Sequence, residues 1–196
     1  MKEGKTTDMN RREEIYLQGR CPCRECSGTR LDEKLVNWIL DFEQKTGLKI
    51  NITSGARCES YNREVGGYWD SPHLTDVNGI GHAIDFRIKG LKPIEVAFKV
   101  EEVALKFGGL ELKRLGIYKY HVHGDLERPN PSKYWYTGND GIPIYSKNIN
   151  NLKDFLIQMK KEGRLSYDEN VVFNRIIGNN FMADIPKKEN GKYLGL

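Results

Sequence analysis

The sequence predicts an α+β domain in which a small antiparallel sheet is flanked by helices. Apolar residues recur at helical spacing over about residues 30–46 and again over residues 93–107. Residues 48–53, 81–88 and 116–126 have the short lengths and apolar patterning typical of strands. With 196 residues, the chain is long enough for one such domain with a substantial hydrophobic core.

The N-terminal part, residues 1–28, is expected to be an arm that carries a cluster of cysteines. Residues 1–20 are polar, rich in charge and weakly patterned. We therefore expect a flexible or loosely docked segment with a short helix around residues 11–17. The core of the domain is expected over residues 29–140.

The first core helix is predicted over residues 30–46. Thr29 and Asp32 have the spacing of a capping box at its start, and Gly47 ends the apolar pattern. Four apolar residues fall on one face of this helix: Leu31, Leu35, Ile39 and Phe42. We expect that face to pack against the core.

Strands and one short helix are expected next. Residues 48–53 alternate apolar and polar side chains and should deliver residues 54–57 to the end of a strand. A short helix is expected over residues 59–65, and a second strand over residues 81–88. Residues 116–126 are expected to form one continuous or kinked strand.

The second core helix begins at Pro93 and is expected to end at the pair Gly108 and Gly109. Residues 141–196 are expected to form a C-terminal helical extension. It would contain an amphipathic helix over residues 150–162 and a second helix over residues 167–177. Packing on the domain and dimerisation are both open as its role, and the sequence does not indicate an oligomeric state.

Composition indicates a soluble protein, with 38% hydrophobic and 30% charged residues and a mild net charge of +4. No apolar run is long enough to span a membrane, and the N-terminus lacks the apolar core of a signal peptide. We therefore expect synthesis in the cytoplasm. Binding to nucleic acid is disfavoured, because no basic helix or aromatic platform accompanies the cysteines.

All four histidines lie in two short parts of the chain, residues 73–85 and 121–125, together with two aspartates. Imidazole and carboxylate groups are the ligands that catalytic zinc uses, with a fourth position left open for a water molecule. Because successive strand side chains point to opposite faces, His82 should point away from Asp85. The predicted ligand set is His73, Asp85 and His123.

The same alternation places His121 and Asp125 on the face of His123. Histidine titrates near neutral pH, so His121 suits proton transfer or stabilisation of an oxyanion. Asp125 is the second candidate for a catalytic role, although it could instead orient His121 or a metal ligand. The identity of the general base stays open, with His121 ahead of Asp125 and both ahead of a carboxylate elsewhere in the chain.

The chain resembles the zinc D-alanyl-D-alanine carboxypeptidase family, which includes VanX-type dipeptidases and phage L-alanyl-D-glutamate endopeptidases, within the superfamily of lysostaphin-type enzymes and the hedgehog domain. The segments that carry the resemblance are Ile52-Thr-Ser-Gly-Ala-Arg57, Asn62 with Val65-Gly-Gly67, Ser71-Pro-His73, Gly81-His-Ala-Ile-Asp85, Gly116-Ile-Tyr118, His121-Val-His123-Gly-Asp125 and Trp135-Tyr-Thr-Gly138. The resemblance implies a zinc peptidase core of the same fold. It also implies that His73, Asp85 and His123 bind zinc and that Arg57 holds substrate, with Ser71 as a second substrate-binding candidate.

Two features depart from the pattern of that family. Residues 74–80 separate His73 from Gly81 by five residues more than usual, and we expect an enlarged loop that could reshape substrate access. Tyr120 stands three residues before the last predicted zinc ligand, where many members carry an acid that serves as the base.

The four cysteines of the chain are Cys21, Cys23, Cys26 and Cys58. Three thiols within six residues suit a compact metal site, which Cys58 could complete as a fourth ligand. A disulfide and free reduced thiols are the alternatives. A second, structural zinc ion beside the catalytic one is therefore one of three open possibilities.

The resemblance implies a peptidase that hydrolyses peptide bonds in peptidoglycan stem peptides, either as a D-Ala-D-Ala carboxypeptidase or as an endolysin-type endopeptidase. Residues 141–196 could bind the cell wall in that case. The protein would act as a phage lysin released to the wall or as a cytoplasmic dipeptidase. The alternative is a non-catalytic zinc-containing binding or virion protein of the same fold.

Overall fold

The computed structural model describes residues 3–23, 26, 28–108, 112–126, 132–147, 149, 151–178, 188–189 and 192–193. A six-stranded sheet has the order β2-β4-β6-β5-β7-β8. Its strands are β2 (Ile50–Ser54), β4 (Ala83–Ile88), β5 (Arg114–Ile117), β6 (Val122–Asp125), β7 (Tyr134–Thr137) and β8 (Pro143–Tyr145). All neighbouring strands run antiparallel except β5 and β7, which are parallel. The predicted α+β fold with a mostly antiparallel sheet is confirmed.

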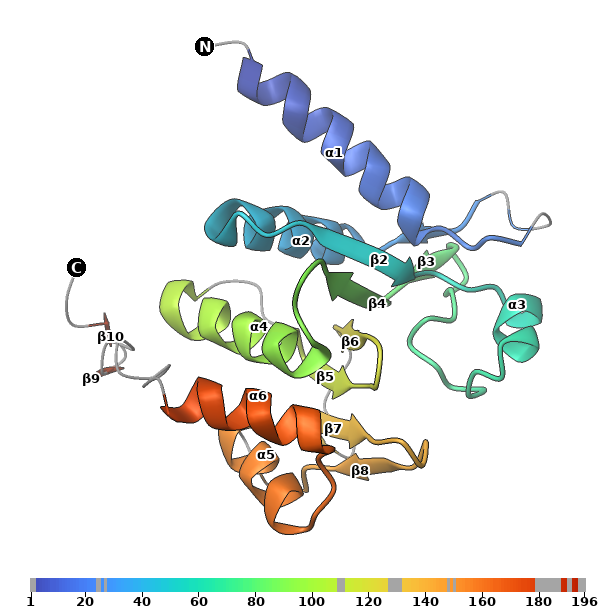
Figure 1. The fold of residues 1–196 in the computed structure, drawn as a ribbon. Helices are drawn as coiled ribbons and strands as arrows, with labels where there is room; N and C mark the ends of the chain where they lie inside the picture. The colour runs from blue at the N-terminus through green and yellow to red at the C-terminus, as the bar shows by residue number, and fades with distance from the viewer. Residues whose placement is uncertain are drawn as a thin grey trace.

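Four helices pack into one hydrophobic core with the sheet: α2 (Glu33–Thr46), α4 (Pro93–Phe107), α5 (Leu152–Lys161) and α6 (Tyr167–Gly178). Figure 1 shows α4, α6 and α5 one below another beside the strands. Strand β4 shows why the sheet has a core face, because Ile84, Phe86 and Ile88 are buried in this core. Asp85 alternates with them and therefore points to the other face. That face is where a site can form.

Helix α2 begins at Glu33, three residues later than expected. Asp32 is the N-cap, and its carboxylate accepts a hydrogen bond from the backbone of Lys34. The expectation of Thr29 as the cap was therefore wrong. At the other end, Gly47 adopts a left-handed conformation with φ 68°, which explains why a glycine ends this helix.

Residues 114–125 form a hairpin of two strands, whereas one continuous or kinked strand was expected over residues 116–126. Strands β5 and β6 pair antiparallel, with Gly116 opposite His123. The chain turns between them, and the backbone N–H of Tyr118 donates to the carbonyl oxygen of His121 at 3.0 Å. The correction matters because it places His121 in a turn and His123 on a central strand.

The N-terminal arm is not loosely docked. Helix α1 (Glu3–Gly19) contains the short helix expected over residues 11–17 but is much longer. It lies across β2 in Figure 1. Ile15 is 0% exposed, and the guanidinium of Arg11 is paired with Glu43 on α2 and bonded to the carbonyl oxygen of Ile50. These contacts fix the helix to the sheet edge.

The enlarged loop pairs with the chain that follows α1. Strands β1 (Arg30–Leu31) and β3 (Ile80–Gly81) form a separate parallel pair. The carboxylate of Asp76 accepts hydrogen bonds from the backbone N–H groups of Asn78 and Ile80 and so holds the turn. The extra residues therefore build a structural connection to the N-terminal part.

The short helix α3 (Glu59–Glu64) lies where a helix over residues 59–65 was expected. Of the expected extension 141–196, residues 148, 150, 179–187, 190–191 and 194–196 lie outside the described part of the chain. Two short strands, β9 (Lys188–Glu189) and β10 (Lys192–Tyr193), pair antiparallel. Among the described residues, none of the helices combines the length and apolar character needed to cross a membrane.

Candidate metal centre

Three side chains from distant parts of the chain meet on the open face of the sheet. Asp85 on β4 and His123 on β6 are directly paired in the strand register, and His73 comes from the loop between α3 and β3. The Nε2 atom of His73 lies 3.2 Å from Oδ1 of Asp85 and 3.1 Å from Nδ1 of His123. The third side of the triangle, from Nδ1 of His123 to Oδ1 of Asp85, is 3.0 Å.

The second nitrogen of each imidazole is already engaged. Nδ1 of His73 lies 2.8 Å from the carbonyl oxygen of Gly55, which can only accept, so this nitrogen carries the proton. Nε2 of His123 lies 2.8 Å from Oδ2 of Asp125. In the neutral rings, the unprotonated nitrogens therefore face Asp85. Such outer hydrogen bonds are typical of metal-binding histidines.

The donor set fits a zinc ion. Two ligand atoms at about 2.05 Å from a tetrahedral ion lie about 3.3 Å from each other. The three observed separations of 3.0–3.2 Å are close to that value. Two imidazole nitrogens and one carboxylate oxygen leave a fourth tetrahedral position for a reacting group, as catalytic zinc sites require.

Electrostatics at this centre favours a cation. Burial alone would lower the pKa of His123, but hydrogen bonds to Asp125 and Asp85 raise it to about 9. Burial would raise the pKa of Asp85, but His73 and His123 hold it well below its usual value. A positive charge is thus stabilised between the carboxylates, and a divalent ion would supply it.

Asp125 lies on the buried side of the centre and not on the side that faces the cleft. It is 0% exposed, and its oxygens accept hydrogen bonds from Nε of Arg114 at 2.9 and 3.0 Å as well as from His123. This placement fits the alternative in which Asp125 orients a ligand. His121 lies on the cleft side, with Nε2 at 3.8 Å from Oδ1 of Asp85.

The structure also places the predicted substrate-binding residues at the centre. Nη2 of Arg57 donates to Oδ2 of Asp85 at 2.9 Å, and its Nε donates to the hydroxyl of Ser54 at 3.0 Å. The hydroxyl of Ser71 accepts a hydrogen bond from the backbone of His73 at 3.3 Å. Arg57 and Ser71 both line a cleft of about 630 Å³ that contains the three candidate ligands.

The fourth histidine lies elsewhere. Nδ1 of His82 is 2.9 Å from Oδ2 of Asp32, the N-cap of α2. The strand argument therefore assigned the direction of His82 correctly. The enlarged loop does not border the cleft either, because the described lining residues end at His73 on that side.

Comparison with known families matches residues 8–125 to the family model described as Peptidase M15. The match covers more than half of the chain. The chain belongs to the Peptidase M15 family. Searches of curated proteins and of solved structures found no match. The predicted family is thus confirmed, although the match does not select a subfamily.

Peptidases of the M15 family depend on zinc, in agreement with the donor set described above. The match begins within α1, so the helix that was expected to be a loose arm is part of the M15 region. It ends at Asp125, the last residue of β6. All three candidate ligands, Arg57 and His121 lie inside it.

Tyr118 and Trp135, which lie in two of the segments that carry the family resemblance, form an aromatic wall of this M15 cleft. The ring of Tyr118 stacks on His121 with centroids 4.5 Å apart, and its hydroxyl accepts a hydrogen bond from Nε1 of Trp135 at 3.1 Å. Trp135 also lies 5.1 Å from the ring of His123. A β-carbon on Gly116 would lie 2.3 Å from Trp135, so a glycine is needed there. The spacing of these residues gave no signal, because they meet across the parallel pair β5 and β7.

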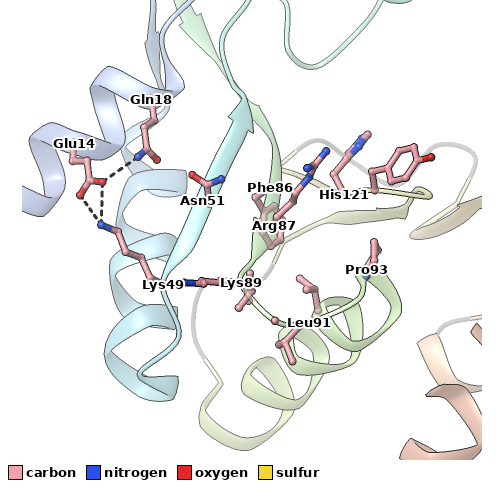
Figure 2. Close-up of a pocket in the computed structure, with 14 residues that line it drawn as sticks. Glu14, Gln18, Lys49, Asn51, Phe86, Arg87, Lys89, Leu91, Pro93 and His121 are labelled. Atoms are coloured by element: carbon pink, nitrogen blue, oxygen red, sulfur yellow. Dashed lines mark hydrogen bonds and ion pairs between the residues drawn. The ribbon is translucent and has the colours of Figure 1, made fainter. Parts of the chain in front are cut away.

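A second hollow continues beyond His121 in the M15 domain. Figure 2 shows it extending from Glu14 and Gln18 on α1 to His121. Lys49 and Arg87 are also among its lining residues. His121 lines both hollows.

Proposed function

We propose that this M15 peptidase hydrolyses a peptide bond in the stem peptides of bacterial peptidoglycan. The observation that carries the proposal is the convergence of His73, Asp85 and His123 with the outer nitrogen of each imidazole engaged. A buried group of two imidazoles and one carboxylate at the bottom of a cleft is suited to zinc-dependent hydrolysis.

Zinc held by these residues would polarise the scissile carbonyl group and make the attacking water molecule more acidic. His121 is the residue placed to accept the proton of that water and deliver it to the leaving amine. Burial lowers the pKa of His121, so its imidazole is neutral near pH 7 and has a nitrogen lone pair free to accept a proton. Stacking on Tyr118 holds the ring at the edge of the centre.

Arg57 and Tyr118 would position the substrate. A guanidinium presents a rigid fork of donors, and Arg57 is held in place by Asp85 and Ser54 at the cleft wall. Burial raises the pKa of Tyr118, so its hydroxyl keeps its proton and can donate a hydrogen bond to a substrate oxygen. Asp125 positions His123 and does not contact the reacting groups.

The rim of the cleft favours a large, partly apolar substrate. Tyr68 and Trp69 line the cleft, yet Trp69 is 87% exposed. Exposed aromatic rings beside a polar cleft offer flat apolar contacts to a substrate while their polar atoms stay in water. A peptide attached to a glycan strand would use both the rim and the cleft.

The test is digestion of purified peptidoglycan and of synthetic stem peptides, with products identified by mass spectrometry. Activity should disappear with a chelator, return with zinc and be absent in His123→Ala. His82→Gln is the matched control, because that histidine bonds Asp32 away from the cleft. The products also show whether the enzyme removes a terminal residue or cleaves an internal peptide bond.

One feature keeps a second function open, namely a zinc-containing binding or virion protein without catalysis. Many members of the family carry an acid as the base at the position of Tyr120. The tyrosine that replaces it here is 62% exposed. Zinc-loaded protein that binds wall fragments without cutting any bond would establish this alternative. The digestion experiment therefore separates the two functions directly.

A further inference from the structure

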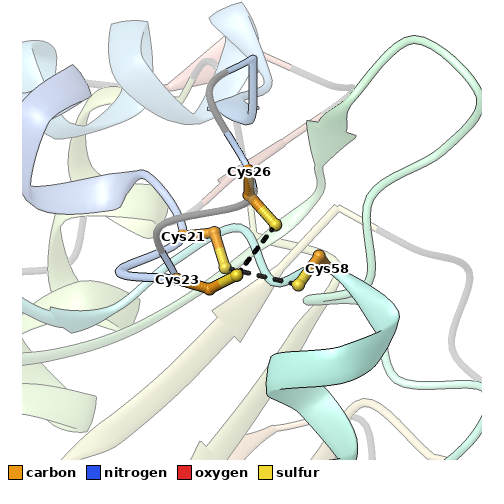
Figure 3. A group of neighbouring side chains, drawn as sticks. All are labelled: Cys21, Cys23, Cys26 and Cys58. Carbon is orange, nitrogen blue, oxygen red and sulfur yellow. Dashed lines mark hydrogen bonds between the residues drawn. The ribbon is translucent and has the colours of Figure 1, made fainter.

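We propose that Cys21, Cys23, Cys26 and Cys58 bind a second zinc ion that ties the N-terminal segment to the segment carrying Arg57. The four thiols are free cysteines, and their sulfur atoms all lie within 4.8 Å of one another. Figure 3 shows the four side chains converging from two separate stretches of chain. This proposal concerns a site outside the cleft and does not depend on the peptidase reaction.

The spacing of the sulfur atoms fits tetrahedral coordination. Two thiolates at about 2.3 Å from a zinc ion lie about 3.8 Å from each other. The sulfurs of Cys21 and Cys58 are 3.8 Å apart, and those of Cys23 and Cys26 are 3.3 Å apart. Two disulfides would require close approach only within each pair. They would not require all four sulfurs to gather around one point.

Backbone hydrogen bonds at the described cysteines support such a site. The backbone N–H of Cys26 donates to the carbonyl oxygen of Cys23 at 3.3 Å. The backbone N–H of Cys21 donates to the hydroxyl of Thr29 at 2.9 Å. The sulfur of Cys58 accepts a hydrogen bond from the backbone of Tyr61 at 3.3 Å, an interaction that favours a thiolate.

A closed set of four thiolates indicates a structural role, since no position is left for a substrate. The bridge would restrain the segment between Gly55 and Cys58. In that segment, the carbonyl oxygen of Gly55 accepts from His73, and Arg57 bonds Asp85. The same segment is bonded to the end of α1, where the backbone of Ala56 donates to the carbonyl oxygen of Gly19 at 2.7 Å. The second ion would therefore stabilise residues 55–58, which hold His73 and Asp85 in the catalytic centre by hydrogen bonds.

The test is metal analysis of the full-length protein purified under reducing conditions. We expect two zinc ions per chain in the wild type, one in His73→Ala, one in Cys23→Ser and none when both changes are combined. Hydrogen exchange at residues 55–58 should become faster in Cys23→Ser and stay unchanged in His123→Ala, whose imidazole bonds Asp85 and Asp125 and not that segment. Equal zinc content in Cys23→Ser and the wild type would overturn the proposal.

X-ray absorption on the His73→Ala variant provides a test that needs no cysteine substitution. The remaining zinc should show four sulfur neighbours at about 2.3 Å. Zinc with nitrogen or oxygen neighbours, iron in place of zinc, or a protein with disulfides in place of the thiols would each contradict the proposal. A wild-type protein without peptidase activity, together with this sulfur signal in His73→Ala, would refute the proposed function and leave the second site intact.

Discussion

Asp125→Asn should weaken zinc binding at the catalytic centre while the domain stays folded. The substitution keeps the volume of a side chain that is 0% exposed, so no cavity is created. Both carboxylate oxygens accept from Nε of Arg114, and one of them also accepts from Nε2 of His123. An amide has only one oxygen, so its NH₂ group must face one of these donors. The orientation of His123 as a ligand is then lost or weakened.

The expected loss is 10- to 100-fold in zinc affinity, or about 1.4–2.8 kcal/mol, the usual cost of removing an outer partner of a metal ligand. We expect the upper end, because the donor–donor contact in Asp125→Asn is buried. Competition with a chromogenic chelator measures the affinity. Asp32→Asn is the matched control, since Asp32 forms a similar pair with His82 at 2.9 Å and asparagine also caps helices well. Equal zinc affinity in Asp125→Asn and Asp32→Asn would refute the assigned role of Asp125.

Three further changes test the supports of the fold and the cleft. Ile15→Ala should cost about 2–5 kcal/mol in the free energy of unfolding, because this side chain is fully buried, whereas Leu17→Ala, 54% exposed, should change it by about 0.5 kcal/mol or less in the same denaturant titration. Gly116→Ala should destabilise by about 1–3 kcal/mol, since its new β-carbon would lie 2.3 Å from Trp135, and unchanged stability would contradict this contact. Arg57→Lys should lower kcat/KM roughly 10- to 100-fold with zinc content unchanged, and full activity in stem-peptide assays would remove the positioning role.

The strand part of the centre was predictable from the sequence for a physical reason. Side chains alternate along a strand, so Asp85 and His82 had to point to opposite faces. The structure pairs Asp85 directly with His123 across β4 and β6. His73 could not be found in this way, because it lies in a loop without a fixed period. Only the motif that contains it, and the resemblance it carries, indicated this residue.

Contacts that depend on which strands become neighbours could not be predicted from the sequence. The parallel pairing of β5 with β7 brings Tyr118 beside Trp135, and nothing in the spacing of these residues indicates that two strands separated by β6 become neighbours. The partner of Arg57 was missed for a similar reason. Its guanidinium bonds Asp85, so one carboxylate serves both the metal position and the substrate-binding arginine. Substituting Asp85 would therefore disturb both functions together.

The N-terminal helix shows how composition can mislead. Its sequence is polar, and Ile15 is the only buried apolar side chain among residues 9–19, which is too weak a period to predict docking. What fixes its end is close backbone approach, since a β-carbon on Gly55 would lie 2.2 Å from the carbonyl oxygen of Gly19. Two glycines so far apart in the sequence give no sign that they touch. The carbonyl oxygen of Gly55 also bonds the imidazole of His73, and the next residue, Ala56, bonds the end of α1. The N-terminal segment therefore belongs to the structural unit that forms the metal centre.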